Sequence, residues 1–209
     1  MKWLQSHRFK TFKESFLQAL LALPHFLKNP IQGMRDLPDW EWPILLALQG
    51  ALALVCGVLS AILSRSILMI FTSIIISPLS AVLTSLILSG FFYYTFLFLL
   101  RREVSFKGVY THILFASIPV LLTNIAAPVI PFIGLLGVAS AAFLLYVGFT
   151  SNLYLPEKKV RYLLMGLVAF YVLAVVLQTV RFYEPEHRRH IKATPESLDI
   201  LEQELKGED

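Results

Sequence analysis

Charged residues are almost absent from the middle of this 209-residue chain. Between Trp42 and Pro156 the only acid is Glu103, and the only Lys and Arg residues are Arg65, Arg101, Arg102 and Lys107. Over the whole chain 15% of residues are charged, against about 25% in soluble domains. Charge-free runs of this length exclude a soluble core, and a bilayer requires them at about 20 apolar residues per helix. The sequence therefore predicts an integral membrane protein.

The residues that catalysis uses are also scarce. Cys56 is the only cysteine, so no internal disulfide can form. Intramembrane catalysis needs paired carboxylates, a metal set or an activated nucleophile. The charge-free runs hold no acids, and Cys56 and His112 stand isolated in them. In the tail, Arg188 and Arg189 separate His187 from His190 and would repel a metal ion. We therefore predict no enzyme, no cofactor and no metal site.

The longest charge-free stretch reads as a hairpin of two transmembrane helices. It runs from Val109 to Leu155, and two apolar runs meet in it at Pro128 and Pro131. Proline lacks the N–H of a helix interior and pushes the preceding residue out of the helical region. We predict helices over Val109–Ala127 and Pro131–Ser151, joined by a very short turn that holds them antiparallel and in contact.

Three further spans complete a predicted all-α bundle of five transmembrane helices. They are Pro43–Leu63, Pro78–Leu100 and Val160–Val180. The run from Arg65 to Leu100 is too long for one perpendicular span and barely long enough for two. We divide it at Pro78 and interpret Ile67–Ile76 as a short interfacial or re-entrant piece. Two alternatives stay open: this piece extends a tilted helix, or the run makes a sixth crossing.

Small and polar residues recur four apart on the predicted spans. Ala53, Gly57 and Ala61 form one such ladder, and Ser77, Ala81, Ser85 and Ser89 form a second. A further set of small residues, at three- and four-residue spacing, is Gly134, Gly137 and Ala141. Small residues allow close helix approach where lipid gives no hydrophobic drive. An amide in hydrocarbon needs a partner, so Asn124 is interhelical glue or part of a polar site. The candidate polar or packing site is Asn124, Pro119, Ser85, Ser89 and Pro78, with Pro119 expected to kink its span.

Flanking helices are predicted on both sides of the five-span domain. We divide the chain into residues 1–41, 42–181 and 182–209. Phe12–Leu27 has apolar residues at helical spacing and basic residues before it, which is typical of an interfacial helix on an anionic leaflet. A helix docked on the bundle is the alternative. In the tail, Thr194 offers an N-cap to a short acidic helix over Pro195–Lys206.

The basic residues predict an orientation. Twelve Lys and Arg residues fall on the N-terminal side of a five-span chain, before the first span and in the two basic loops. Because short basic loops stay in the cytoplasm, we predict a cytoplasmic N-terminus. Basic residues beside spans point to lipid headgroups and not to nucleic acid. A bacterial cytoplasmic membrane is our first expectation and an early secretory membrane the second.

Several segments resemble a known family. Phe26–Met34 resembles the segment before the first span of the Yip family, the Ypt/Rab-interacting-type multi-pass membrane proteins. Tyr110 followed by Phe115-Ala-Ser-Ile-Pro119 is similar to its aromatic–small–Ser–x–x–Pro pattern, and Ile130–Gly134 and Tyr146–Phe149 also match. The Asp-Leu-Tyr-Gly-Pro motif of eukaryotic members is absent. The resemblance implies a short bacterial-type member with the five-span fold.

Two functions remain after enzymes are set aside. The resemblance implies a membrane-organising or trafficking-type adaptor, which would bind lipids or protein partners through its terminal helices and could form a homodimer through the small-residue ladders. The alternative is a lipid or small-solute conduit without intramembrane charges, along a groove lined by Ser77, Ser85, Ser89 and Asn124.

Overall fold

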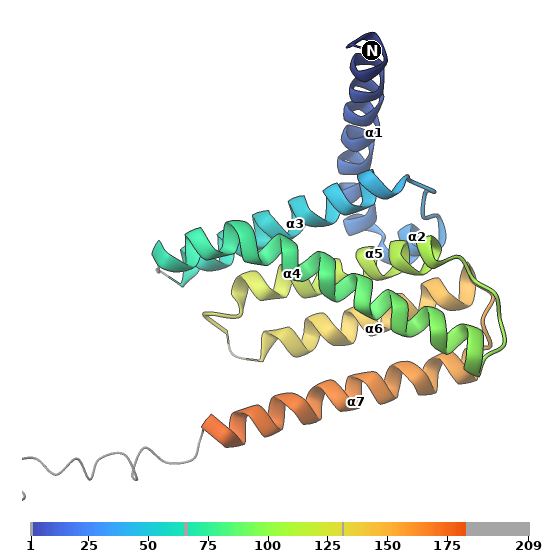
Figure 1. The fold of residues 1–209 in the computed structure, drawn as a ribbon. Coiled ribbons are helices and arrows are strands. Elements are labelled where there is room, and N and C mark those ends of the chain that lie inside the picture. Colours follow the sequence, from blue (N-terminus) through green and yellow to red (C-terminus); the bar gives the residue numbers. More distant parts are fainter. Residues whose placement is uncertain (1, 65–66, 131, 183–209) are drawn as a thin grey trace, which may run out of the picture. The chain divides into compact units, whose positions relative to one another are not determined.

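The computed structural model describes residues 2–64, 67–130 and 132–182, and every regular element in these ranges is a helix. The helices are α1 (Lys2–Lys28), α2 (Pro30–Arg35), α3 (Trp42–Leu63), α4 (Ile67–Tyr94) with a π-helical turn (Thr95–Leu99), α5 (Phe106–Ala126), α6 (Ile133–Ser151) and α7 (Glu157–Phe182) (Figure 1). The predicted all-α class is confirmed. The chain forms two compact units, residues 1–168 and residues 169–209, and the arrangement below is that of the first.

Five of the described helices are long and apolar enough to cross a membrane. These candidate spans are Trp42–Leu63, Ile70–Leu99, Phe106–Ala126, Ile133–Ser151 and Glu157–Leu177. The predicted number of spans is therefore confirmed. The predicted tail helix over Pro195–Lys206 and the His187–His190 cluster lie outside the described residues.

Helix α5 lies at the centre of the first unit. The Ser105 side chain caps its start by accepting a hydrogen bond from the Gly108 N–H at 3.4 Å. Every residue from Val109 to Ala116 is buried, whereas a surface helix would bury one stripe. This all-round burial follows from its neighbours, because α5 packs against α2, α3, α4 and α6.

The predicted division of the chain at Pro78 is wrong. Helix α4 continues through Pro78, so Ile67–Ile76 is not a separate re-entrant piece and the extended-helix alternative is the one observed. Breaking a helix in hydrocarbon would leave several backbone groups unpaired, whereas continuing through proline loses one hydrogen bond. The 30-residue span Ile70–Leu99 is about 45 Å long. It exceeds a hydrocarbon core of about 30 Å, so it must tilt or project into the headgroups.

The hairpin is present with shifted boundaries. Helix α5 begins at Phe106, three residues before the predicted Val109, because Ser105 provides the cap. Helix α6 begins at Ile133 and ends at Ser151 as predicted. Its N-cap residue Phe132 has a φ of 69°, a left-handed conformation that side chains rarely adopt. The two helices are in contact, as the short turn requires.

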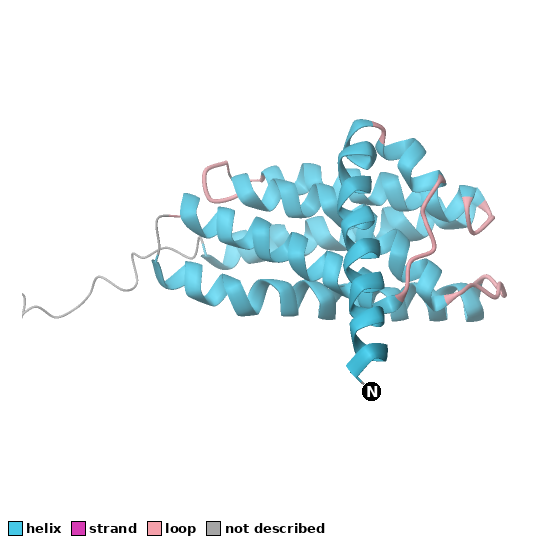
Figure 2. Cartoon of the chain, turned by 90° about the horizontal axis from the view of Figure 1, so that it is seen from above, coloured by secondary structure: helices cyan, strands magenta, loops and turns pink. Residues whose placement is uncertain are grey.

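The N-terminal segment is more helical than the sequence indicated. Helix α1 extends over Lys2–Lys28 and continues through Pro24, where Phe12–Leu27 was predicted. The short helix α2 forms at Pro30–Arg35, where we expected only a break. Helix α1 runs across the direction of α3, α4, α5 and α6 (Figure 2). Its Ala19 and Phe26 are buried in the bundle core, which supports the docked alternative for this half of α1.

Candidate functional site

The predicted ladders of α3 and α4 pack against each other. The Ser77 hydroxyl donates a hydrogen bond to the Ala53 carbonyl at 2.7 Å. A Cβ added to Gly57 would lie 2.5 Å from Ser77 Oγ and 2.7 Å from Ser77 Cβ, which is closer than real Cβ atoms approach. Gly57 is therefore required for this contact, and the small residues bring the two backbones together.

A buried glutamine on α3 joins three helices. It lies one helical turn before Ala53 and two turns before Gly57. Gln49 of α3 is 1% exposed. Its Nε2 donates to the Ala81 carbonyl of α4 at 2.9 Å and to Ser85 Oγ, and its Oε1 accepts from the Tyr110 hydroxyl of α5. Both amide protons and the amide oxygen are used, so the polar group is satisfied within the apolar bundle. We call Gln49, Ser85 and Tyr110 the Gln49 cluster.

The structure places two predicted site residues at this cluster. Ser85 is part of it, and Ser89 lies one turn further along α4 and donates its hydroxyl to the Ser85 carbonyl at 2.6 Å. Both are buried. Our sequence reasoning missed Gln49 and Tyr110. The available signal was that Gln49 is the one amide side chain within Pro43–Leu63 and precedes Ala53 and Gly57 at the same four-residue spacing.

A polar cleft opens between α3, α4 and α5 toward the ends of α3 and α5. Its volume is about 390 Å³. Hydroxyl, thiol and amide side chains provide most of its polar lining: Cys56, Ser60, Ser64, Thr72, Ser73, Ser77 and Asn124. Among the residues that the structure describes, no Asp, Glu, Lys or Arg lines it. We call this the outer cleft, and it has donors and acceptors for a neutral polar group or water.

Asn124 lies at the outer cleft and is exposed. Its backbone makes a hydrogen bond to another helix, because its carbonyl accepts from Ser60 Oγ at 3.0 Å. The two predicted prolines lie elsewhere. Pro78 faces Gly50, where an added Cβ would be 3.9 Å from Pro78 Cβ. Pro119 lines a separate apolar groove, and α5 continues through it. The five predicted residues therefore do not form one site.

A second polar contact fastens α2 to the bundle. His112 Nδ1 donates to the Gly108 carbonyl at 2.7 Å, so its Nε2 accepts from Asn152 Nδ2 at 3.1 Å. The same Asn152 amide donates to the Met34 carbonyl at 2.9 Å. Gly148 makes room for this contact, since an added Cβ would overlap the His112 ring and lie 2.8 Å from Met34 Cε. We call it the His112–Asn152–Met34 contact.

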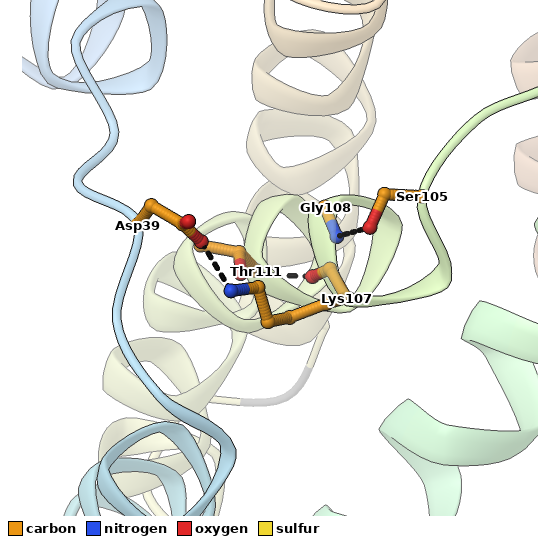
Figure 3. Close-up of polar contacts among 5 residues, drawn as sticks. All are labelled: Asp39, Ser105, Lys107, Gly108 and Thr111. Atoms are coloured by element: carbon orange, nitrogen blue, oxygen red, sulfur yellow. Dashed lines mark hydrogen bonds and ion pairs between the residues drawn. The ribbon is translucent and has the colours of Figure 1, made fainter.

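Aromatic and charged residues lie where α3 and α5 begin. The Trp42 ring is 5.8 Å from the Phe106 ring and 5.0 Å from the Tyr110 ring, measured between centroids. Lys107 forms an ion pair with Asp39 (Figure 3), in which Nζ lies 2.5 Å from Oδ1. Asp39 is mostly exposed, so this pair contributes little stability. Indole rings beside such charges are typical of a membrane interface.

The described residues contain no group of three or more His, Cys, Asp or Glu side chains that could hold a metal ion. Apart from charged residues near the starts of α5 and α7, the polar side chains of the candidate spans are hydroxyls, amides, the Cys56 thiol and the His112 imidazole. They are suited to hydrogen bonding and helix packing.

The Yip1 domain family model matches residues 25–178 of the chain. Comparison with curated proteins and with solved structures finds no match. The matched range begins within α1 and includes α2, the five candidate spans and most of α7.

Proposed function

The chain belongs to the family of Yip1 domain proteins, and from that premise we propose that this multi-pass membrane protein is a non-enzymatic, membrane-organising or trafficking-type adaptor. Its partners would be lipids or proteins that bind its terminal helices. We further propose that it lies in a bacterial cytoplasmic membrane with its N-terminus in the cytoplasm. Homodimer formation and docking through the acidic tail helix stay predictions, and the tail lies outside the described residues.

The observation that carries the proposal is the way α1 is held. Its buried residues Ala19 and Phe26 belong to the bundle core, and the Phe26 and Phe115 rings are 5.1 Å apart. On the same helix Lys13, Glu14 and Gln18 are exposed. The His112–Asn152–Met34 contact fixes α2, which follows α1 directly. The exposed leucines Leu17 and Leu21 lie beside these polar residues. A rigid attachment with an exposed face of this kind is what presentation of a docking helix requires.

Site-specific photocrosslinking in intact membranes tests the adaptor role. A photoreactive residue at Glu14 or Gln18 should give discrete protein adducts, identified by mass spectrometry. The same residue at Leu83, which is exposed on α4, is the control for collisional crosslinking. Equal adduct patterns from α1 and α4, or none from α1, would contradict docking through this helix.

The conduit alternative is favoured by one observation. The outer cleft shares Ser77 with the α3–α4 ladder, and this ladder leads to the Gln49 cluster. A row of polar groups along the spans is one path by which a lipid headgroup or a small solute could cross the membrane. Liposomes with full-length protein should then show flip-flop of dye-labelled lipid or solute leakage above empty vesicles. If the protein is a conduit, Ser77→Leu should slow this lipid or solute movement. If it is an adaptor, vesicles with folded protein should show no movement above that of empty vesicles.

Orientation has its own test. In a Cys56→Ser background, we expect single cysteines at Glu103 and Ile130 to react with an impermeant maleimide from opposite sides. Glu103 lies between the π-helical turn and α5, and Ile130 lies between α5 and α6. Labelling of Glu103→Cys from outside intact cells would refute a cytoplasmic N-terminus.

A further inference from the structure

An apolar groove lies on the side of the bundle formed by the α1–α2 junction, α5 and α6. Its volume is about 520 Å³, within the range of about 300–1,000 Å³ for small-molecule sites. Phe26 and Ile31 line it from the α1–α2 junction, and Pro119 and Phe143 line it from α5 and α6. We call it the α1–α6 groove.

A polar hollow adjoins this groove. Pro30 and Ile31 line both, so the two meet at the first turn of α2. The hollow has a volume of about 440 Å³, and Asn29, Gln32, Arg35 and Asp36 supply its polar lining. We call it the α2 hollow. Among the described residues, neither Arg35 nor Asp36 has an ion-pair partner, so both charges can face a ligand.

The depths of the two cavities correspond to one leaflet. Asn152, at the end of the α6 span, donates to the Met34 carbonyl, so Met34 and the neighbouring Arg35 lie at the level where α6 leaves the membrane. Ser140 of the groove lies twelve residues earlier in α6, or about 18 Å along the helix axis. Half of a hydrocarbon core is about 15 Å. The combined cavity therefore extends from the headgroup level to about the bilayer midplane.

The chemistry along this path is that of a phospholipid. Pro119, Leu122 and Ser140 lie within candidate spans, where the surrounding medium is hydrocarbon. The acyl chain of a lipid gains little free energy by moving from the bilayer into an apolar groove. Selectivity among phospholipids therefore has to come from the headgroup. Arginine binds phosphate with a planar pair of donors, and an ammonium group fits the Asp36 carboxylate. Together the two side chains have no net charge and match a zwitterion.

We propose that the α1–α6 groove and the α2 hollow together bind one phosphatidylethanolamine molecule. One acyl chain lies along α5 and α6, its phosphate binds Arg35, and its primary ammonium donates to Asp36 with Asn29 and Gln32 beside it. The proposal does not depend on protein docking at Lys13, Glu14 and Gln18, because none of these residues lines the groove or the hollow.

The headgroup assignment is tested with full-length protein in mild detergent by native mass spectrometry. The probes are phosphatidylethanolamine, phosphatidylglycerol and phosphatidylcholine with identical acyl chains. Because the quaternary ammonium of choline cannot donate, we expect phosphatidylethanolamine to bind about tenfold more tightly than phosphatidylcholine. Asp36→Asn should remove this preference. Glu103→Gln, which removes an exposed acid outside the hollow, should preserve it.

Arg35→Gln should weaken all three phospholipids by about fivefold. Arg102→Gln is the matched control, because Arg102 is exposed and lies outside the hollow. Equal losses for the two variants would reduce the effect to general surface charge and overturn the site. A preference for phosphatidylglycerol over phosphatidylethanolamine would overturn the zwitterion match.

The groove is tested by filling it. Ser140→Phe should abolish retention of the bound lipid, and the smaller filler Ala139→Leu should weaken it. Ser80→Phe makes the same change at an exposed position of α4 outside the groove and should have no effect. Unfolding temperatures of all variants establish that they are folded. Unchanged lipid retention in folded Ser140→Phe, or a protein adduct in place of a lipid adduct from a photoreactive residue at Ser140, would refute the proposal.

Discussion

At the end of the bundle where α3 and α5 begin, Gln49, Tyr110 and His112 are buried and bonded to neighbouring helices. At the opposite end, where α3 and α5 finish, Ser60 and Asn124 line an open cleft. We call these the packed end and the open end. Both use uncharged polar side chains within apolar spans.

The difference shows that residue type alone does not assign a role to a polar side chain in a membrane. At the packed end each amide has its partners inside the protein, so removing it leaves unpaired groups in a medium without water. At the open end the amide of Asn124 is exposed, and its backbone carries the interhelical bond. Substitutions should therefore destabilise the packed end most and change stability little at the open end.

The largest expected effect comes from Gly148→Ala at the packed end. The added Cβ would overlap the His112 ring, which hydrogen bonds hold at both nitrogens. We expect a loss of about 2 kcal/mol in the free energy of unfolding, measured by denaturant titration in mixed micelles. Gly90→Ala is the matched control, because nothing lies within 4 Å of its added Cβ. A loss in Gly148→Ala as small as that in Gly90→Ala would show that the His112 ring moves aside to accept the added Cβ.

Gln49→Leu should have the next largest effect. It leaves the Tyr110 hydroxyl without its acceptor in the core, and we expect a loss of about 1–2 kcal/mol in the same titration. Tyr110→Phe in the Gln49→Leu background removes the orphaned hydroxyl and should restore part of that loss. If the double variant loses the sum of the two single losses, the two groups are not coupled and the Gln49 cluster does not stabilise the packed end.

The same contrast explains which features could be read from the sequence. The five spans follow from charge-free runs, which any bilayer-crossing helix requires. The ladders of α3 and α4 were predictable because small residues at four-residue spacing share one helix face. The continuation of α4 through Pro78 was not predictable. The free-energy cost of breaking a helix depends on the medium around it and not on the proline alone.

The polar contacts were the least predictable part. The hydrogen-bond partners of Gln49 are separated from it by 32, 36 and 61 positions in the sequence. Asn152 and Met34 are separated by 118 positions. Such pairs depend on how helices rotate against one another, which local patterns do not encode. Asn124 stood out because of its amide, but Gln49 has the same chemistry and the buried position.

A small effect is expected for Lys107→Gln at the membrane interface of the packed end. The pair with Asp39 is close but exposed, so its loss should change the free energy of unfolding by no more than about 0.5 kcal/mol. High salt should remove this difference between variant and parent, because exposed charges are screened. A loss above 1 kcal/mol that persists in high salt would mean that Lys107 has a packing role.

The smallest effect on stability is expected for Asn124→Leu at the open end. The variant keeps the carbonyl that accepts from Ser60, and the exposed amide has little buried bonding to lose. We expect the free energy of unfolding to stay within about 0.5 kcal/mol of the parent. The liposome assay then separates the remaining roles of the outer cleft. Reduced lipid or solute movement at unchanged stability would assign the amide to a conduit. A loss of stability as large as that of Gln49→Leu would show that the open end is packed like the other, and the distinction between the two ends would fall.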